Sequence, residues 1–116
     1  MSGVNDLTDN AKMCLKLLKW YRKNLYLNEA ASELGERYRK FGQSVSEIVS
    51  KMDNTDRRIW EYCYSQNITD REARPQVGLS HSRFSDRKHL FVQRLTNSAT
   101  TEQLKEWGRL LNARNQ

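Results

Sequence analysis

The chain has 116 residues, a net charge of +6 at pH 7 and an isoelectric point near 9.5. This length fits one domain, and the basic charge favours polyanionic partners. No run approaches the roughly 18 apolar residues that a bilayer span needs, and the polar start MSGVNDLTDN lacks the order of a signal peptide. We therefore expect a cytoplasmic protein without a membrane segment.

The distribution of helix formers and breakers predicts an all-α fold. Pro75 is the one proline, and no stretch alternates strictly between apolar and polar residues. From about residue 8 to residue 41, Gly35 alone weakens the helical pattern, which predicts one long helix or two helices with a break near Asn28. Spacings of four and three place a heptad seam on this segment. The seam consists of Met13, Leu17, Trp20, Asn24, Leu27, Ala31, Leu34, Tyr38 and Phe41.

The seam has two interpretations. It packs on the C-terminal helices of its own chain, or it joins two copies of the chain into a homodimer. Its polar member, Asn24, is the kind of residue that sets the register of a coiled coil. The candidate residues of a dimer or partner interface are Leu17, Trp20, Leu27, Leu34 and Trp107. The tripeptide GQS at 42–44 predicts a joint after this N-terminal unit, residues 1–43.

Helix starts are predicted from capping residues, because a Ser, Thr or Asn side chain accepts a hydrogen bond from a free backbone N–H of the first turn. A Glu or Gln three residues later can reciprocate. Three such pairs are Ser44 with Glu47, Thr69 with Glu72 and Thr100 with Gln103, and Asn54 is a fourth candidate cap. The last pair introduces a predicted amphipathic helix over residues 101–111.

The central region is predicted to hold a helix-turn-helix. The pattern indicates a helix from 54 to about 65, a turn at 66–67, a helix from 69, a turn at 77–79 and a helix from about 80 to 95. Phe84 and Phe91 form the inward stripe of the last helix, and Lys88 falls on the same stripe. Pro75 predicts that the helix before the turn is short, kinked or irregular, because proline removes a backbone donor.

The outer face of the helix from Ser80 is predicted to contact DNA. Arginine can bind guanine through two hydrogen bonds, and serine suits base edges or phosphates. Between residues 71 and 94, six Arg or Lys residues stand against two acidic ones. The predicted DNA-binding residues are Arg71, Arg74, Ser80, His81, Ser82, Arg83, Ser85, Asp86, Arg87 and Lys88.

These residues carry a resemblance to a known family. The order Ile68-Thr69, Ala73, Val77-Gly78-Leu79-Ser80, Ser82-x-Phe84, Lys88 and Phe91 resembles the C-terminal helix-turn-helix of the ArpU/RinA-like phage transcriptional regulators, itself similar to region 4 of sigma factors. The similarity covers about residues 53–96, with a looser match in MCLKLLKWYRKNL. It implies a phage or prophage protein that binds double-stranded promoter DNA and controls late or lysis genes in a Gram-positive host. Arg74 departs from the pattern, which usually keeps a small alanine there.

The resulting organisation is an N-terminal unit over 1–43, a DNA-binding region over 44–96 and a C-terminal helix over 97–116. That last helix completes the core, dimerises or contacts host RNA polymerase. The alternative function is a phage-encoded inhibitor or adaptor that binds a host protein, such as a regulator, a nuclease or RNA polymerase. In that case the Trp and Leu residues of EQLKEWGRLL would anchor the partner.

An enzyme is not predicted. His81 and His89 lack a partnered Ser, Cys or carboxylate pattern, and their separation does not match a helical metal site. The chain also has no glycine-rich phosphate loop. Cys14 and Cys63 lack disulfide or zinc-ligand spacing and are expected to be buried free thiols. We therefore expect no catalytic residue, metal or cofactor.

Overall fold

The computed structural model describes residues 7–25 and 32–114. All regular structure in these two ranges is helical, which confirms the predicted all-α class. The helices are α1 (Asp9–Lys23), α3 (Glu33–Val49), α4 (Asn54–Ile59), the π-helix η1 (Trp60–Tyr64), α5 (Asp70–Val77), α6 (His81–Ser98) and α7 (Thr101–Arg114). None of these helices combines the length and apolarity needed to span a bilayer.

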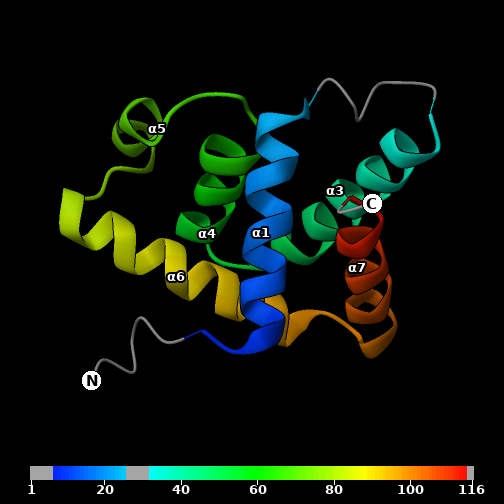
Figure 1. Cartoon of the computed structure of the whole chain (residues 1–116). Helices are drawn as coiled ribbons and strands as arrows, with labels where there is room; N and C mark the ends of the chain where they lie inside the picture. The colour runs from blue at the N-terminus through cyan, green and yellow to red at the C-terminus, as the bar shows by residue number, and fades with distance from the viewer. Residues whose placement is uncertain (1–6, 26–31, 115–116) are drawn as a thin grey trace.

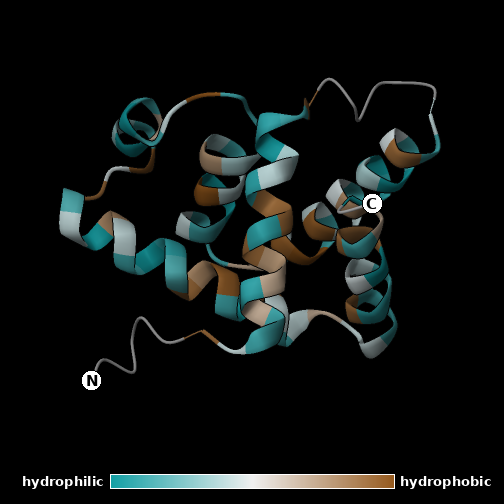
Figure 2. Cartoon of the chain, viewed as in Figure 1, coloured by the Kyte–Doolittle hydropathy of each residue, from teal (hydrophilic) through white to brown (hydrophobic). Residues whose placement is uncertain are grey.

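Helix α1 crosses the middle of the molecule and joins two groups of helices (Figure 1). Helices α4, α5 and α6 lie on one side of it, and α3 and α7 lie on the other. Its buried face, formed by Ala11, Cys14, Leu17 and Leu18, packs into the core between them. Figure 2 shows α5 and the first half of α6 mainly in hydrophilic colours, so this end of the molecule carries the polar surface.

Within the described residues, the N-terminal pattern forms the separate helices α1 and α3, which agrees with the second of the two predicted alternatives. Thr8 caps α1 by accepting a hydrogen bond from the backbone N–H of Ala11 at 3.2 Å, and α1 ends at Lys23. The break predicted near Asn28 lies outside the described residues. Asn24 does not sit in a helical seam, because it is the C-cap of α1 and its Nδ2 donates to the Trp20 carbonyl at 3.0 Å.

The predicted joint at 42–44 is wrong, and so is the capping box at Ser44. Helix α3 runs through Gly42 and Ser44 to Val49. The reason is tertiary, because Val45 and Val49 extend the buried face of this helix into the core.

Two of the three predicted capping boxes are confirmed. The backbone N–H of Thr69 donates to Glu72 Oε1 at 3.0 Å, and the N–H of Glu72 donates to Thr69 Oγ1 at 3.2 Å. Thr100 and Gln103 form the same reciprocal pair. The predicted cap at Asn54 is displaced by one residue, because Asp53 caps α4.

Aromatic rings from α1, α3, η1, α6 and α7 contribute to the core. Trp20 stacks on Tyr38 with ring centroids 4.4 Å apart, and Trp107 meets Phe41 edge-on at 5.3 Å. Cys14 and Cys63 are buried free thiols, as predicted.

This core includes two of the residues that were assigned to an interface. Leu17 is 0% exposed and Trp107 is 2% exposed, so both side chains are buried by intramolecular packing and cannot contact a partner. Trp20 and Leu34 are half-buried against the same core, and Leu27 lies outside the described residues. The burial of these side chains therefore supports the prediction that the first helix packs on the C-terminal helices of its own chain.

Candidate nucleic-acid interface

A single left-handed glycine orients the two helices that carry the predicted DNA-binding residues. Helix α5 is only eight residues long and ends two residues after Pro75, as the proline predicted. Gly78 then adopts φ +81°, a conformation that side-chain-bearing residues rarely take, and its N–H donates to the Arg74 carbonyl at 3.1 Å. Ser80 caps α6 two residues later, so its hydroxyl already accepts a hydrogen bond from the Arg83 N–H at 3.4 Å.

The two helices enclose a hollow of about 420 Å³. Its lining consists of Asp70, Arg71, Arg74, His81, Phe84, Ser85 and Lys88, and the Asp70 carboxylate is paired with Lys88 and Arg22. Neither of its arginines forms an ion pair with any residue in the described ranges. The hollow therefore combines two unneutralised guanidinium groups from α5 with hydrogen-bonding groups from the first turns of α6, which suits an anionic partner.

The first two turns of α6 present polar side chains to solvent. His81, Ser82, Arg83, Ser85 and Asp86 are all exposed. Arg83 follows His81 by two residues, which places it about 200° around the helix, on the flank away from the hollow. It too lacks an ion pair among the described residues. Both flanks of the start of α6 thus offer groups that can reach a ligand.

Lys88 faces inward, unlike the five exposed residues. Its Nζ donates to Asp70 Oδ2 at 2.7 Å and lies 5.2 Å from the centroid of the Phe84 ring. Arg22 from α1 donates to the other oxygen of the same carboxylate at 3.0 Å. Burial raises the pKa of Asp70, but the hydrogen bonds and charges of Lys88 and Arg22 outweigh it and leave that pKa below its usual value. Lys88 therefore ties α6 to α5, and its place on the apolar stripe is explained by this pair.

Arg87 is also engaged inside the chain. Its Nη2 lies 3.3 Å from Asp53 Oδ1 and 3.4 Å from Asp56 Oδ1. Arg94, one heptad further along α6, donates to Asp56 Oδ2 at 2.9 Å. These bonds anchor α6 on the start of α4, so Arg87 and Lys88 are positioning residues and not free members of the predicted surface.

The sequence interpretation assigned no role to Asp53, Asp56 or Asp70. The sequence did contain a pattern that indicates these ion pairs. Arg87 and Arg94 share one face of a helix, and Asp53 and Asp56 lie together at the start of another. What the pattern lacked was the distance between the two helices, which only the fold supplies.

A second set of residues was missed on α1. Lys12, Lys16, Lys19 and Lys23 follow the spacing four, three, four and are all exposed. No ion pair in the described part of the chain involves any of them. They form a basic stripe, the α1 lysine stripe, opposite the buried face of the same helix.

Comparison of the chain with protein-family models, with curated proteins and with solved structures finds no match. Its function is therefore inferred from its own surface. Two sets of basic side chains form no ion pair within the described residues: Arg71, Arg74 and Arg83 on α5 and the start of α6, and the α1 lysine stripe.

Proposed function

We propose that this protein is a sequence-specific transcriptional regulator that binds double-stranded DNA, with α6 lying in the major groove. The main observation behind the proposal is that Arg71 and Arg74, which form no ion pair among the described residues, lie around one hollow with the exposed first turns of α6. An α-helix with side chains is about 10 to 12 Å wide, and the major groove of B-DNA is about 12 Å wide. A helix of this kind therefore fits the groove while its neighbour meets the backbone.

The proposed contacts follow from side-chain chemistry. His81, Ser82, Arg83 and Ser85 offer donors and acceptors to base edges, and the Asp86 carboxylate can accept from cytosine N4. Arg71 and Arg74 would neutralise phosphates beside the groove, a contribution that carries no sequence information. Ser80, Arg87 and Lys88 would act indirectly, by capping and anchoring α6.

The biological setting is proposed from the resemblance to ArpU/RinA-like regulators, which favours control of late or lysis genes of a phage or prophage.

A homodimer and a contact with host RNA polymerase belong to the same proposal. Because Leu17 and Trp107 are core residues, a dimer would use the half-buried Leu34 and Trp20 instead. Leu34→Asp should then convert a dimer into a monomer in sedimentation, and a monomeric wild type would refute the dimer.

The alternative of a helical inhibitor that binds a host protein has less support. Its proposed anchor, Trp107, is 2% exposed and packs against Phe41, so it is not presented to a partner. A hot-spot residue must be able to enter a pocket on the other protein.

The test begins with selection of binding sites from a random duplex pool by the wild-type protein. Arg83→Ala should lower the affinity for the selected site about tenfold or more and relax the preference at one base position. Arg71→Ala and Arg74→Ala should weaken binding to all sequences alike, and each should reduce the slope of log affinity against log salt by about one.

Arg109→Ala in α7 is the matched control. Within the part of the chain that the structure describes, this exposed arginine bonds only Glu106, one turn away. Helix α7 lies on the opposite side of α1 from α5 and α6 (Figure 1). It should leave affinity and sequence preference unchanged. Failure of the wild type to enrich any sequence, or equal effects of Arg83→Ala and Arg109→Ala, would refute the proposal.

A further inference from the structure

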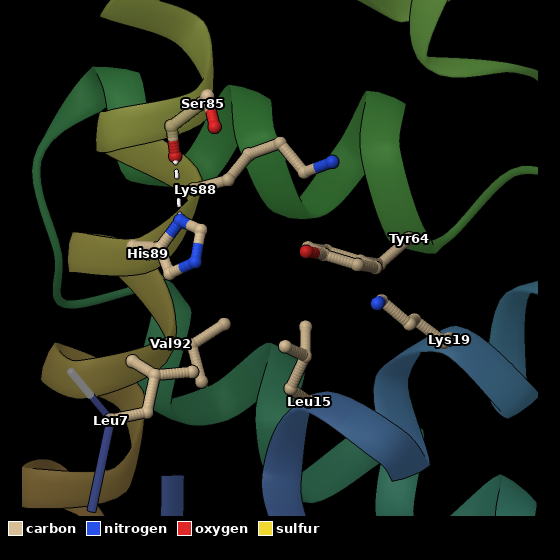
Figure 3. Close-up of a pocket in the computed structure, with 8 residues that line it drawn as sticks. All are labelled: Leu7, Leu15, Lys19, Tyr64, Ser85, Lys88, His89 and Val92. Atoms are coloured by element: carbon tan, nitrogen blue, oxygen red, sulfur yellow. Dashed lines mark hydrogen bonds between the residues drawn. The ribbon is translucent and has the colours of Figure 1, made fainter. Parts of the chain in front are cut away.

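A cavity of about 130 Å³ lies where α1, the end of η1 and α6 meet (Figure 3). Leu15 and Lys19 reach it from α1, Tyr64 from η1, and His89 and Val92 from α6. A π-helical turn such as η1 is rare and is found frequently at functional sites. The cavity is distinct from the hollow between α5 and α6, although it adjoins it through Ser85 and Lys88.

Tyr64 supplies an unused hydrogen-bond donor to this cavity. The residue is 2% exposed, and its ring stacks on Phe91 with centroids 5.9 Å apart. Its hydroxyl oxygen is buried and has no hydrogen-bond partner among the described residues. Figure 3 shows this hydroxyl pointing across the cavity toward His89. Buried polar groups are nearly always paired, so a donor in this position indicates a missing acceptor.

Two lysines line the cavity, and one of them, Lys88, is paired with Asp70. Lys19 reaches toward Tyr64 from α1 and has no ion pair within residues 7–25 and 32–114 (Figure 3). No described residue that lines the cavity is acidic. His89 Nδ1 lies 3.0 Å from the Ser85 carbonyl, which can only accept, so Nδ1 carries the proton and Nε2 is left for other contacts. The unused donor and the free ammonium together favour a negatively charged acceptor.

The opposite wall is apolar. Leu7, Leu15 and Val92 line it, and Figure 3 shows Leu15 and Val92 facing the space below Tyr64 and His89. A dry apolar cavity of about 150 Å³ accommodates benzene. The apolar wall and the slightly smaller volume of about 130 Å³ therefore set an upper limit of about six carbon atoms for the apolar body.

We propose that this cavity binds a small organic monoanion, in which a carboxylate is attached to a compact aliphatic or aromatic body. The Tyr64 hydroxyl donates to the carboxylate, the Lys19 ammonium lies beside it, and the body packs on Leu15 and Val92. This site is independent of the proposed DNA binding, because none of its three recognition elements is needed for a DNA contact.

Benzoate is the probe, and benzamide is its neutral counterpart of the same shape. Binding is followed on the full chain by chemical-shift titration. Ligands with about nine non-hydrogen atoms bind weakly, so saturation by benzoate is expected in the millimolar range, with benzamide about tenfold weaker. Shifts should centre on Leu15, Tyr64, His89 and Val92.

Variants separate this site from non-specific binding. Tyr64→Phe keeps the ring stacked on Phe91 but removes the donor, and should weaken benzoate binding about tenfold. Lys19→Gln should weaken it about threefold, as an exposed charge contact does. Lys16→Gln, an exposed lysine on the same helix that does not line the cavity, should leave it unchanged.

The proposal is overturned by any of three results. These are no saturable shift up to about 20 mM benzoate, equal binding of benzoate and benzamide, or equal binding by the wild type and Tyr64→Phe. The melting temperature of Tyr64→Phe checks its fold. The comparison of the two probes on the wild type tests the proposal even if that variant does not fold.

Discussion

Arg94 donates a hydrogen bond from Nη1 to Asp56 Oδ2 at 2.9 Å, and the Asp56 side chain is 1% exposed. The pair joins α6 to α4, and Arg87 supplies a second guanidinium to the same carboxylate at 3.4 Å. A buried carboxylate with two cations tolerates the loss of one of them far better than the loss of both. The orientation of α6 relative to the rest of the core depends on this cluster.

Arg94→Ala should lower the free energy of unfolding by about 2 kcal/mol, and Arg87→Ala, with its longer contact, by less. The double variant should cost about 5 kcal/mol, more than the sum of the two, because Asp56 is then buried without a cation. Urea unfolding of the four proteins measures this coupling. Additive effects would show that Asp56 gains little from having two partners.

Acid should weaken the fold through Asp53. The pKa of Asp53 is lowered mainly by the hydrogen bond from the backbone N–H of Asp56, with further lowering by Arg87 and Arg94. A carboxyl with a depressed folded-state pKa adds stability that is complete above its unfolded pKa of about 3.9 and is lost as the pH falls through the lower folded value.

The free energy of unfolding of the wild type should therefore decline below about pH 4. Asp53→Asn removes the charge but keeps an oxygen that can cap α4, so its stability should decline less steeply over the same range. Urea unfolding at several pH values provides the comparison. Parallel curves for the two proteins would count against this role of Asp53.

Two glycines inside helices should respond to alanine in opposite directions. A Cβ on Gly42 would lie 2.7 Å from ring atoms of Tyr21, which is itself packed between Phe41 and Trp60. Overpacking of this kind costs about 1 to 3 kcal/mol, more than the roughly 1 kcal/mol that alanine gains in a helix. Gly42→Ala should therefore lower the melting temperature.

Gly108→Ala is the control. Its Cβ would lie 3.6 Å from Met13 Sδ, an ordinary contact, so the helical gain of about 0.5 to 1 kcal/mol should appear as added stability. In the Gly42→Ala background, Tyr21→Phe should recover part of the loss, because it removes the hydroxyl from the crowded ring. Stabilisation by Gly42→Ala would show that the Tyr21 ring moves aside freely.

Trp107→Ala distinguishes a core residue from a partner anchor. Because Trp107 is 2% exposed and meets Phe41, its truncation should cost about 3 to 5 kcal/mol in thermal or urea unfolding. An interface anchor would be lost with little change in the stability of the isolated chain. A variant as stable as the wild type would restore the helical-inhibitor alternative.

Local chemistry accounts for what could be predicted from the sequence. Neighbouring residues set the beginnings of α5 and α7, because the capping boxes at Thr69 and Thr100 act within three residues. Gly78 likewise sets the chain reversal before α6 through its own backbone conformation. Helical spacing likewise predicted the inward stripe with Phe84 and Phe91, and the absence of metal-ligand spacing predicted buried free cysteines.

Tertiary packing decided the rest. Ser44 has the same local pattern as Thr69, but the helix continues through it because Val45 and Val49 are buried in the core. In the sequence, nothing distinguishes Arg83 from Arg87 and Lys88, because all three are basic residues of the same helix. Arg87 and Lys88 are held inside the chain because their carboxylate partners, between 18 and 34 positions away, are brought beside α6 by the fold. The sequence alone determined the all-helical class and the caps at Thr69 and Thr100, since these depend on neighbours in the chain. The fold decided where α3 ends and which charges are neutralised, since these depend on neighbours in space.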